Sequence, residues 1–240
     1  NHCEKLDWSR GAFANYLVAP AANVYRLRPE TSLTDIALAE PLACVVRGQN
    51  QVRPREGEWA LVSGAGPLGL LHMQRLRLLG VRVIAADLLD SRLAIARELG
   101  VEATVNPTRE DVRSVVAGHT GGWGADLAVV ANGQMEAVRQ SFDNLGVGGR
   151  LLLFAGIYPK TELCIEPNVL HYGEKCIAGT SDYLVADFQE ARELIESGAV
   201  RIAPLISDVL PLSLISEAMG LVEDRARLKV VVRCDAEASS

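Results

Sequence analysis

Aromatic residues, positive charge and long apolar runs are all scarce in this sequence. Phe, Trp and Tyr make up 5% of its 240 residues, and the formal net charge at pH 7 is −6. The chain has no basic block with interleaved aromatic residues, which argues against nucleic acid as a partner. No stretch approaches the roughly 20 apolar residues of a membrane span, and no signal peptide is recognisable. We therefore expect neither nucleic acid nor a membrane as a partner.

The cysteines do not form a disulfide framework. They are odd in number and scattered over the chain, at Cys3, Cys44, Cys164, Cys176 and Cys234. A small secreted domain usually carries an even number of cysteines, whereas free thiols persist in a reducing compartment. The sequence thus predicts a cytoplasmic protein in which Cys44, Cys164, Cys176 and Cys234 serve as small apolar residues.

Apolar residues make up 49% of the sequence and lie in short strand-like and helix-like segments that alternate along the chain. Such alternation predicts an α/β fold with a doubly wound parallel sheet, the Rossmann architecture. The strands are predicted at residues 58–63, 81–87, 103–106, 125–131, 149–156 and 176–180. The helices are predicted at residues 68–79, 91–99, 109–117, 134–144 and 167–172.

The two ends of the chain depart from this alternation. Before the first strand we expect β-like stretches at 12–20 and 23–27. We also expect a helix interrupted at Glu40, because Pro41 follows, and a second helix over 42–49. After the last strand we expect helices at 186–197 and 212–224, a short segment at 204–206 and a strand at 228–233, with no further βαβ unit.

The most informative motif is a glycine turn between the first predicted strand and the helix that follows it. Its glycines are Gly64, Gly66 and Gly69, in the G-x-G-x-x-G spacing of dinucleotide-binding domains. The first permits a tight turn, the second lets a pyrophosphate approach the backbone, and the third lets the helix pack on the sheet. The helix starts at Pro67 and Leu68, and its N-terminus would present free N–H groups, of which Pro67 itself has none, and a partial positive charge to the phosphates.

An acidic residue stands where this motif requires one. Asp87 ends the second predicted strand, eighteen residues after Gly69. Its carboxylate would accept hydrogen bonds from the ribose hydroxyls of the adenosine and would repel a 2′-phosphate, which favours NAD over NADP. Arg92 would stack on the adenine or, alternatively, reach a 2′-phosphate. The alternative for the whole motif is a glycine turn in an α/β sheet that binds no ligand.

Further motifs join the glycine turn in one pattern. They are Gly11-Ala12-Phe13-Ala14-Asn15-Tyr16, Ala39-Glu40-Pro41-Leu42-Ala43, Ile195-Glu196-Ser197-Gly198 and Pro204-Leu205-Ile206. With the glycine turn, Asp87 and Arg92, they resemble the medium-chain dehydrogenase/reductase superfamily, and within it the zinc-dependent alcohol, polyol (sorbitol) and threonine dehydrogenases. The resemblance covers nearly the whole chain.

The resemblance implies that a catalytic lobe is missing. In that family a GroES-like domain precedes the cofactor domain and supplies Cys and His ligands to the catalytic zinc, whereas this sequence begins at Asn1. Residues 1–40 are then a remnant of the β-rich domain, residues 41–180 the NAD-binding domain, and residues 181–240 a return to the catalytic domain. The resemblance also implies a homodimer or homotetramer.

Two residues are candidate zinc ligands by the same resemblance. In polyol dehydrogenases the glutamate of the Glu-Pro-Leu motif is a ligand, directly or through water, which makes Glu40 a candidate for metal binding and catalysis. The alternative is an acid that balances the dipole of the helix after it. Cys3 resembles the last of four cysteines that bind a structural zinc, and is otherwise a free thiol.

The ends of the later strands supply the remaining candidates. Ligands of open α/β sheets bind outside the carboxyl ends of the strands. The resemblance places two strand-end turns along the nicotinamide, namely Asn132 with Gly133, and Ala155 with Gly156 and Ile157. Tyr183, after the last strand, is a candidate for selecting a hydroxylated substrate. The alternatives are ordinary strand-end turns and a surface tyrosine.

The leading prediction is a zinc-dependent oxidoreductase that transfers a hydride between NAD and a small secondary alcohol or polyol. The cofactor would carry the hydride chemistry, and the protein would position it. Two alternatives stay open. One is a zinc-free, NADPH-dependent enzyme like the quinone reductases, and the other is a truncated dinucleotide-binding module without catalysis.

Overall fold

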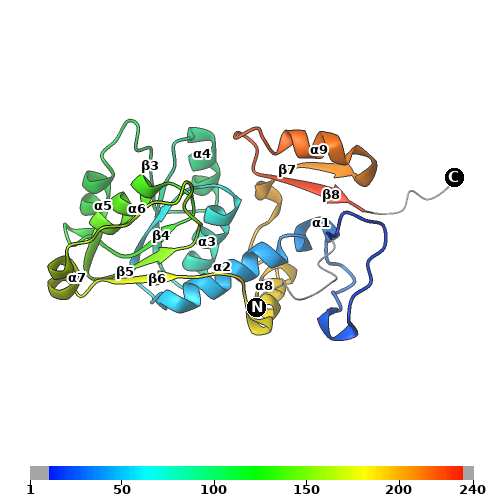
Figure 1. Ribbon diagram of the computed structural model, residues 1–240, viewed down its shortest axis with the longest axis horizontal. Helices are drawn as coiled ribbons and strands as arrows, with labels where there is room; N and C mark the ends of the chain where they lie inside the picture. Colours follow the sequence, from blue (N-terminus) through cyan, green and yellow to red (C-terminus); the bar gives the residue numbers. More distant parts are fainter. Residues whose placement is uncertain (1–10, 235–240) are drawn as a thin grey trace.

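The computed structural model of this protein describes residues 11–234, and its centre is a six-stranded parallel sheet. The strand order is β3-β2-β1-β4-β5-β6, so the chain starts in the middle, winds to one edge and crosses back to build the other (Figure 1). The strands are β1 (Trp59–Ser63), β2 (Arg82–Ala86), β3 (Ala103–Val105), β4 (Ala125–Val130), β5 (Leu145–Leu153) and β6 (Cys176–Gly179). The predicted doubly wound fold is confirmed.

Helices cover both faces of this sheet because its strands are buried on both sides. On β1, Ala60 and Val62 pack into the core of one face, and Leu61 packs into the other. The first face is covered by α2 (Ala39–Val52), α3 (Pro67–Leu78), α4 (Asp90–Glu98) and α8 (Val185–Glu196). The second is covered by α5 (Val112–Thr120), α6 (Met135–Asp143) and α7 (Pro167–Gly173). Near-continuous apolar strands are typical of such two-sided burial.

The C-terminal part of the described chain forms a small unit of its own. Strands β7 (Ile206–Pro211) and β8 (Lys229–Arg233) pair in parallel, and α9 (Ile215–Leu221) connects them. This is a βαβ unit, so the expectation of none after residue 180 is wrong. β7 escaped detection because its sequence, Ile-Ser-Asp-Val-Leu-Pro, has neither a continuous apolar run nor a regular alternation of polar and apolar residues. The short 3₁₀ helices η3 (Ala203–Leu205) and η4 (Leu212–Leu214) flank it.

The segment before α2 contains no strand among residues 11–38, so the β-like stretches expected there are wrong. The 3₁₀ helix η2 (Ala21–Asn23) interrupts backbone that is extended at Pro20 and Val24. Extended residues become a strand only when a neighbouring strand takes up their backbone hydrogen bonds. No strand within residues 11–234 does so here.

Pro41 does not interrupt a helix, which corrects a second expectation. The short helix α1 (Leu33–Ile36) ends four residues before Glu40, and α2 begins at Ala39 with Pro41 inside its first turn. Proline is tolerated in a first turn because the N–H it lacks would have no helical acceptor there. Glu40 and Pro41, in the first turn of α2, line the pocket described below.

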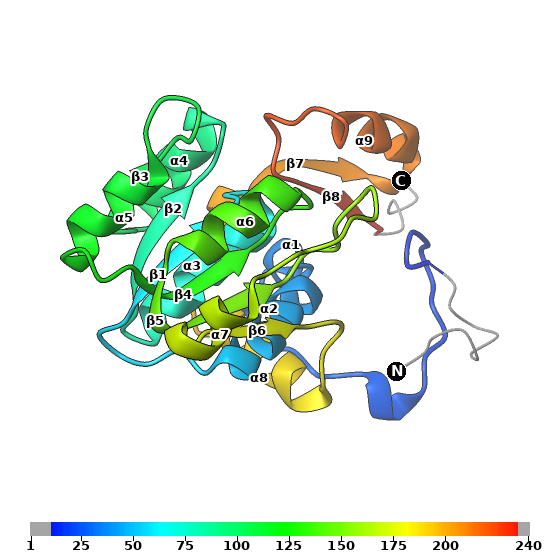
Figure 2. The same cartoon turned by 60° about the vertical axis from the view of Figure 1, so that its left-hand side comes forward.

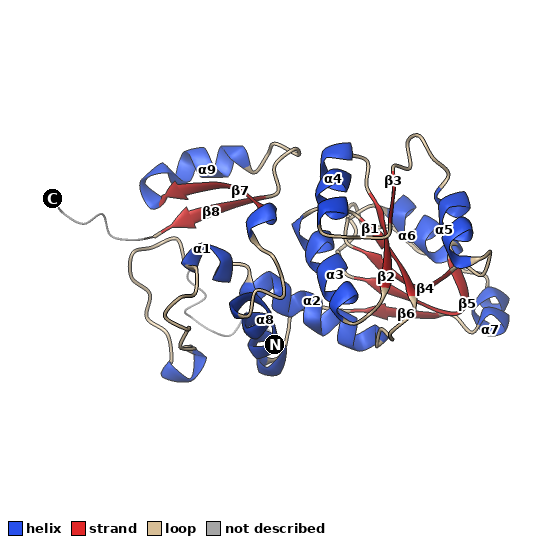
Figure 3. Cartoon of the chain, turned by 180° about the vertical axis from the view of Figure 1, so that it is seen from behind, coloured by secondary structure: helices blue, strands red, loops and turns tan. Residues whose placement is uncertain are grey.

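The carboxyl ends of the sheet strands face the C-terminal unit, as Figures 2 and 3 show from two sides. Residues from β8, α2 and the ends of β5 and β6 line one common pocket. Among the described residues, no helix is both long and apolar enough to cross a membrane.

Candidate functional site

The glycine turn has the geometry that its sequence predicts. Gly64 has φ +102°, a conformation that side chains rarely adopt, and Gly66 caps the N-terminus of α3 without a side-chain hydrogen bond. A Cβ on Gly69 would lie 1.8 Å from the carbonyl oxygen of Gly64, which explains why the third position of the motif must be glycine. The backbone N–H groups of Leu68 and Gly69 donate to no other described residue. The turn therefore opens onto free N–H donors.

Asp87 lies beside this turn. Its Oδ2 accepts a hydrogen bond of 2.7 Å from the backbone N–H of Ala65, and its Oδ1 accepts one of 2.9 Å from Leu89. The nearest basic group is the guanidinium of Arg92, with Nη1 3.9 Å from Oδ2. Arg92 also donates to the carbonyl oxygen of Arg225, in the loop before β8, at 2.7 Å. The ribose-binding candidate is thus held between the glycine turn and the C-terminal unit.

The strand-end turns meet at the same edge of the sheet. The Nδ2 of Asn132 donates to the carbonyl oxygen of Ser63 at 3.2 Å, and a Cβ on Gly133 would lie 3.0 Å from the carbonyl oxygen of Gly156. The N–H of Ala155 donates to Val130 at 3.2 Å. Ile157, in contrast, packs against the core on the α6 face.

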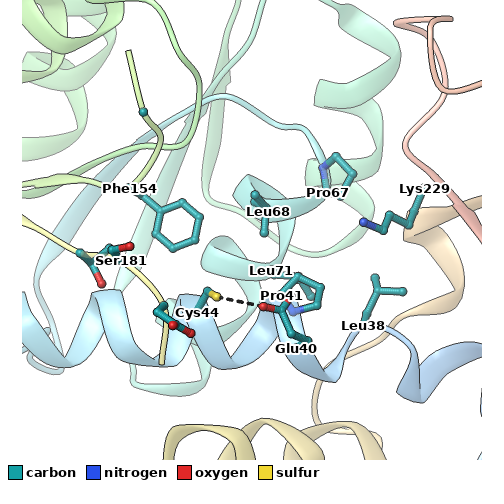
Figure 4. A pocket seen from close by; sticks show the side chains of 13 residues that line it. Leu38, Glu40, Pro41, Cys44, Pro67, Leu68, Leu71, Phe154, Ser181 and Lys229 are labelled. Atoms are coloured by element: carbon teal, nitrogen blue, oxygen red, sulfur yellow. Dashed lines mark hydrogen bonds between the residues drawn. The ribbon is translucent and has the colours of Figure 1, made fainter. Parts of the chain in front are cut away.

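A pocket of about 530 Å³ opens where these elements converge (Figure 4). Glu40 and Cys44 of α2 lie on its floor, opposite Leu68 of the glycine-turn helix. The thiol of Cys44 donates to Oε1 of Glu40 over 3.6 Å. Burial and the adjacent Glu40 raise the pKa of Cys44 to about 12, so the thiol stays protonated. The remaining lining residues are Leu38, Pro41, Pro67, Leu71, Phe154, Gly156, Thr180, Ser181, Asp182 and Lys229.

Tyr183 lies beside this pocket without lining it. Its ring stacks on Phe188 at a centroid distance of 5.9 Å, and Tyr25 packs on the same Phe188 at 5.2 Å. Partial burial, together with the negative charges of Glu40 and Asp182, raises the pKa of the Tyr183 hydroxyl. The tyrosine is therefore near the candidate metal ligand and held by an aromatic stack.

Lys229 is a residue of the site that the sequence analysis did not find. It lines the first pocket and also a neighbouring cavity of about 640 Å³, which Gly66, Pro67 and Leu68 line as well. Figure 4 shows its side chain reaching from β8 toward Pro67. The sequence offers only a lysine at the start of a terminal strand, and nothing local indicates that this strand returns to the glycine turn.

The described residues do not provide a complete metal site. No group of three or more His, Cys, Asp or Glu side chains converges within residues 11–234 in a way that could hold a metal ion. Glu40 is exposed at the pocket and fits the role of one ligand. Cys3, the other predicted ligand, lies outside the described residues.

The fold and the glycine turn define a dinucleotide-binding domain of the Rossmann class. A family described as "Zinc-binding dehydrogenase" matches residues 67–197. A 2-dehydro-3-deoxy-L-galactonate 5-dehydrogenase from Pseudoalteromonas atlantica is 32% identical over 98% of this chain and 70% of its own length. The chain belongs to the zinc-binding dehydrogenases of the medium-chain dehydrogenase superfamily, which confirms the resemblance.

Other relatives and solved structures agree with this assignment. An L-threonine 3-dehydrogenase from Symbiobacterium thermophilum is 28% identical over 95% of this chain and 65% of its own length. A zinc-binding dehydrogenase from Sinorhizobium meliloti bound to NADP superposes with a TM-score of 0.87 at 27% identity, covering 92% of this chain and 66% of its own. A 2R,3R-butanediol dehydrogenase from Bacillus subtilis gives 0.78 at 28% identity, covering 87% and 60%. The chain thus spans about two thirds of the length of such relatives.

Proposed function

We propose that the protein is an oxidoreductase that transfers a hydride between NAD and a secondary alcohol or polyol. One observation carries this proposal: the open glycine turn, Asp87 and the Glu40 pocket adjoin one another at the carboxyl edge of the sheet. Ligands of open α/β sheets bind at that edge. Binding cofactor and substrate side by side in one pocket supplies the orientation that hydride transfer requires.

Each part of the cofactor has a proposed contact on this chain. The free N–H groups of Leu68 and Gly69 at the start of α3 would receive the pyrophosphate, since helix N-termini favour anions. Lys229 would add a positive charge from the opposite side of the cavity. Asp87 would hold the adenosine ribose next to Arg92. The two strand-end turns, at Asn132–Gly133 and Ala155–Ile157, would flank the nicotinamide.

Glu40 is the residue of this chain that would hold a catalytic zinc, with the other ligands coming from protein outside the present sequence. A catalytic zinc has about three protein ligands and one open position. When bound, the zinc would lower the pKa of the substrate hydroxyl. The exposed carboxylate at the head of α2 supports this role, since the helix start aims it into the pocket. We also propose Cys3 as a ligand of a structural zinc.

The substrate would occupy the part of the pocket between Glu40 and the end of β6. Thr180, Ser181 and Asp182 supply polar groups there, and Tyr183 lies behind them. The relatives are named for substrates that include threonine, sorbitol, a galactonate derivative and butanediol. We therefore propose a small hydroxylated molecule, which the polar end of the pocket is suited to bind.

Turnover tests this proposal directly. A form of the protein that also supplies the other zinc ligands is incubated with zinc, NAD and a panel of polyols, sugar acids and hydroxyamino acids, and the appearance of NADH absorbance is followed. NADH formation with one of these substrates, lost when zinc is chelated, is the expected result. Cofactor binding without any turnover would instead identify a dinucleotide-binding module. Turnover that persists in chelator would contradict the role of zinc.

Replacing Asp87 with serine is expected to reduce the preference for NAD. The change removes the ribose acceptor and the negative charge that repels a 2′-phosphate, while Arg92 remains. NAD binding should weaken about tenfold and the ratio of NADP to NAD dissociation constants should fall by at least as much, as measured by calorimetry. Asp143→Ser is the matched control, because Asp143 is exposed at the end of α6. An unchanged ratio in Asp87→Ser would contradict the role of Asp87.

Replacing Lys229 with glutamine is expected to weaken NAD binding roughly tenfold, because one charge near the pyrophosphate is lost. Adenosine, which carries no phosphate, should bind as it does to the unmodified protein. Competition with NADH fluorescence measures both affinities. Lys160→Gln is the control, since Lys160 is exposed in the loop after β5. Equal loss of adenosine and NAD would assign Lys229 a structural role instead.

A further inference from the structure

One residue that lines the candidate pocket has a strained backbone that no helix end explains. Between residues 11 and 234, three residues other than glycine have a positive φ. Arg53, at +47°, and Glu174, at +48°, end α2 and α7, where a left-handed residue commonly closes a helix. Asp182, at +62°, ends no helix, because it lies between β6 and the start of α8. Its place in the pocket therefore indicates a role in the site.

The carboxylate of Asp182 is available to a ligand. Its Oδ1 accepts a hydrogen bond of 2.9 Å from the backbone N–H of Tyr183. Within the part of the chain that the structure describes, no donor bonds to its Oδ2 and no basic group pairs with it. Burial, and then the negative charges of Glu40 and Asp182, raise the pKa of the Tyr183 hydroxyl. The β6 end of the pocket thus carries negative charge without a counterion.

Positive charge lies at the other end of the pocket. Lys229 is the one basic residue among the described residues that line it, and it also lines the neighbouring cavity beside Gly66. Figure 4 shows Ser181 and Lys229 on opposite sides of the pocket. In the proposed function the pyrophosphate lies near Lys229, and the nicotinamide lies near Gly156, which lines the same pocket as Asp182. The two ends therefore match an anionic pyrophosphate and a cationic ring.

We propose that Asp182 selects the oxidation state of the cofactor: its carboxylate stabilises the positively charged nicotinamide ring of NAD and gives no such stabilisation to NADH. This inference rests on the proposed function. The ring carries one positive charge in NAD and none in NADH, because the added hydride neutralises it. An interaction that differs between two forms shifts the balance between them. Asp182 thus moves the equilibrium of the bound reactants toward NAD and the alcohol, and promotes the exchange of NADH for NAD.

Parallel calorimetric titrations with NAD and NADH test this inference in the unmodified chain and in Asp182→Asn. Asparagine tolerates a positive φ, and its amide oxygen can still accept from Tyr183, so the substitution removes mainly the charge. NAD should bind about twofold to fivefold more weakly to the variant, the range of an exposed ion pair, whereas NADH should bind as before. Added salt should reduce this loss, because it screens an exposed charge. ADP-ribose, which has no nicotinamide, should bind equally to both proteins.

Glu174→Gln is the matched control, because Glu174 is an exposed acidic residue with a positive φ at the opposite end of β6. This variant should keep the ratio of NAD to NADH affinity. Equal weakening of NAD and NADH in Asp182→Asn would overturn the inference and assign Asp182 a structural role. Unchanged binding of both cofactors would overturn it as well, and the proposed function would stand in either case. No binding of either cofactor to the unmodified chain would contradict the proposed function itself.

Discussion

Replacing Gly69 with alanine is expected to abolish measurable NAD binding and to lower the stability of the fold. The added Cβ would lie 1.8 Å from the carbonyl oxygen and 2.8 Å from the carbonyl carbon of Gly64. Both atoms are backbone, so no side-chain rotation relieves the overlap, and either the glycine turn or the start of α3 must move. A shift of that turn displaces the free N–H groups that would hold the pyrophosphate. We expect NAD affinity to fall at least a hundredfold, about 2.7 kcal/mol.

A second glycine provides the matched control for this substitution. Gly118 lies inside α5, and a Cβ there would meet no atom within 4 Å. Gly118→Ala should therefore leave NAD binding unchanged and raise the free energy of unfolding by about 0.5 to 1 kcal/mol, the helix preference of alanine over glycine. Calorimetric titration and thermal melting of both variants give the comparison. Normal NAD affinity in Gly69→Ala would contradict the proposed position of the cofactor.

Mild acid is expected to destabilise the protein through His72. The imidazole is fully buried, with Nδ1 3.0 Å from Nε2 of Gln49 and its ring edge-on to Phe154 at 4.3 Å. The Oε1 of Gln49 accepts from Arg75 at 2.9 Å, which leaves the amide NH₂ of Gln49 to donate to Nδ1. Burial, reinforced by the positive charge of Arg75, lowers the pKa of His72 from 6.5 to about 3. The ring is therefore neutral in the folded protein.

The sign of the pH dependence follows from this lowered pKa. Below pH 6.5 the unfolded chain binds a proton at His72 that the folded protein does not bind until about pH 3. The free energy of unfolding should thus fall by about 1.4 kcal/mol per pH unit across that window, or about 2.7 kcal/mol between pH 6.5 and 4.5. Above pH 6.5 His72 is neutral in the folded and the unfolded chain, so the protein keeps its full free energy of unfolding. In the upper part of this pH range most Asp and Glu side chains stay ionised, so they add little to the pH dependence of stability.

Urea unfolding at several pH values measures this dependence in the unmodified protein and in His72→Gln. The glutamine carbonyl can still accept from Gln49 but does not titrate, so the variant should be less stable at pH 7 and nearly independent of pH down to 4.5. His171→Gln, an exposed histidine on α7, should keep the original slope. If His72→Gln retains that slope, another group is responsible for the acid sensitivity.

The sequence predicted the central sheet well because each of its strands carries a local signal. The six segments are short, apolar and separated by helices of regular period, and the glycine turn marks where β1 ends and α3 begins. Strand limits were less accurate: β5 was expected at residues 149–156 and lies at Leu145–Leu153. The pairing of β5 with β4 begins with Leu145 opposite Ala125 and then shifts register, so that Arg150 pairs with Leu127. No local sequence pattern reveals this shift.

The errors concern segments whose structure depends on distant partners. β7 forms only because β8 pairs with it, and residues 12–20 stay unpaired because no described strand is available to them. The same reason accounts for Lys229, which reaches the glycine turn only through the return of the chain at β8. The partner of Glu40 was likewise not predictable, because its hydrogen bond from Cys44 depends on side-chain positions.

Calorimetric titration of this chain with NAD, and separately with NADP, tests the central claim most directly. The claim is that the glycine turn, the start of α3 and Asp87 form a working dinucleotide site that prefers NAD. Saturable binding of one NAD per chain, with weaker binding of NADP, is the predicted result. Tighter binding of NADP would contradict the role of Asp87 and indicate that Arg92 receives a 2′-phosphate. No binding of either cofactor would contradict the site itself.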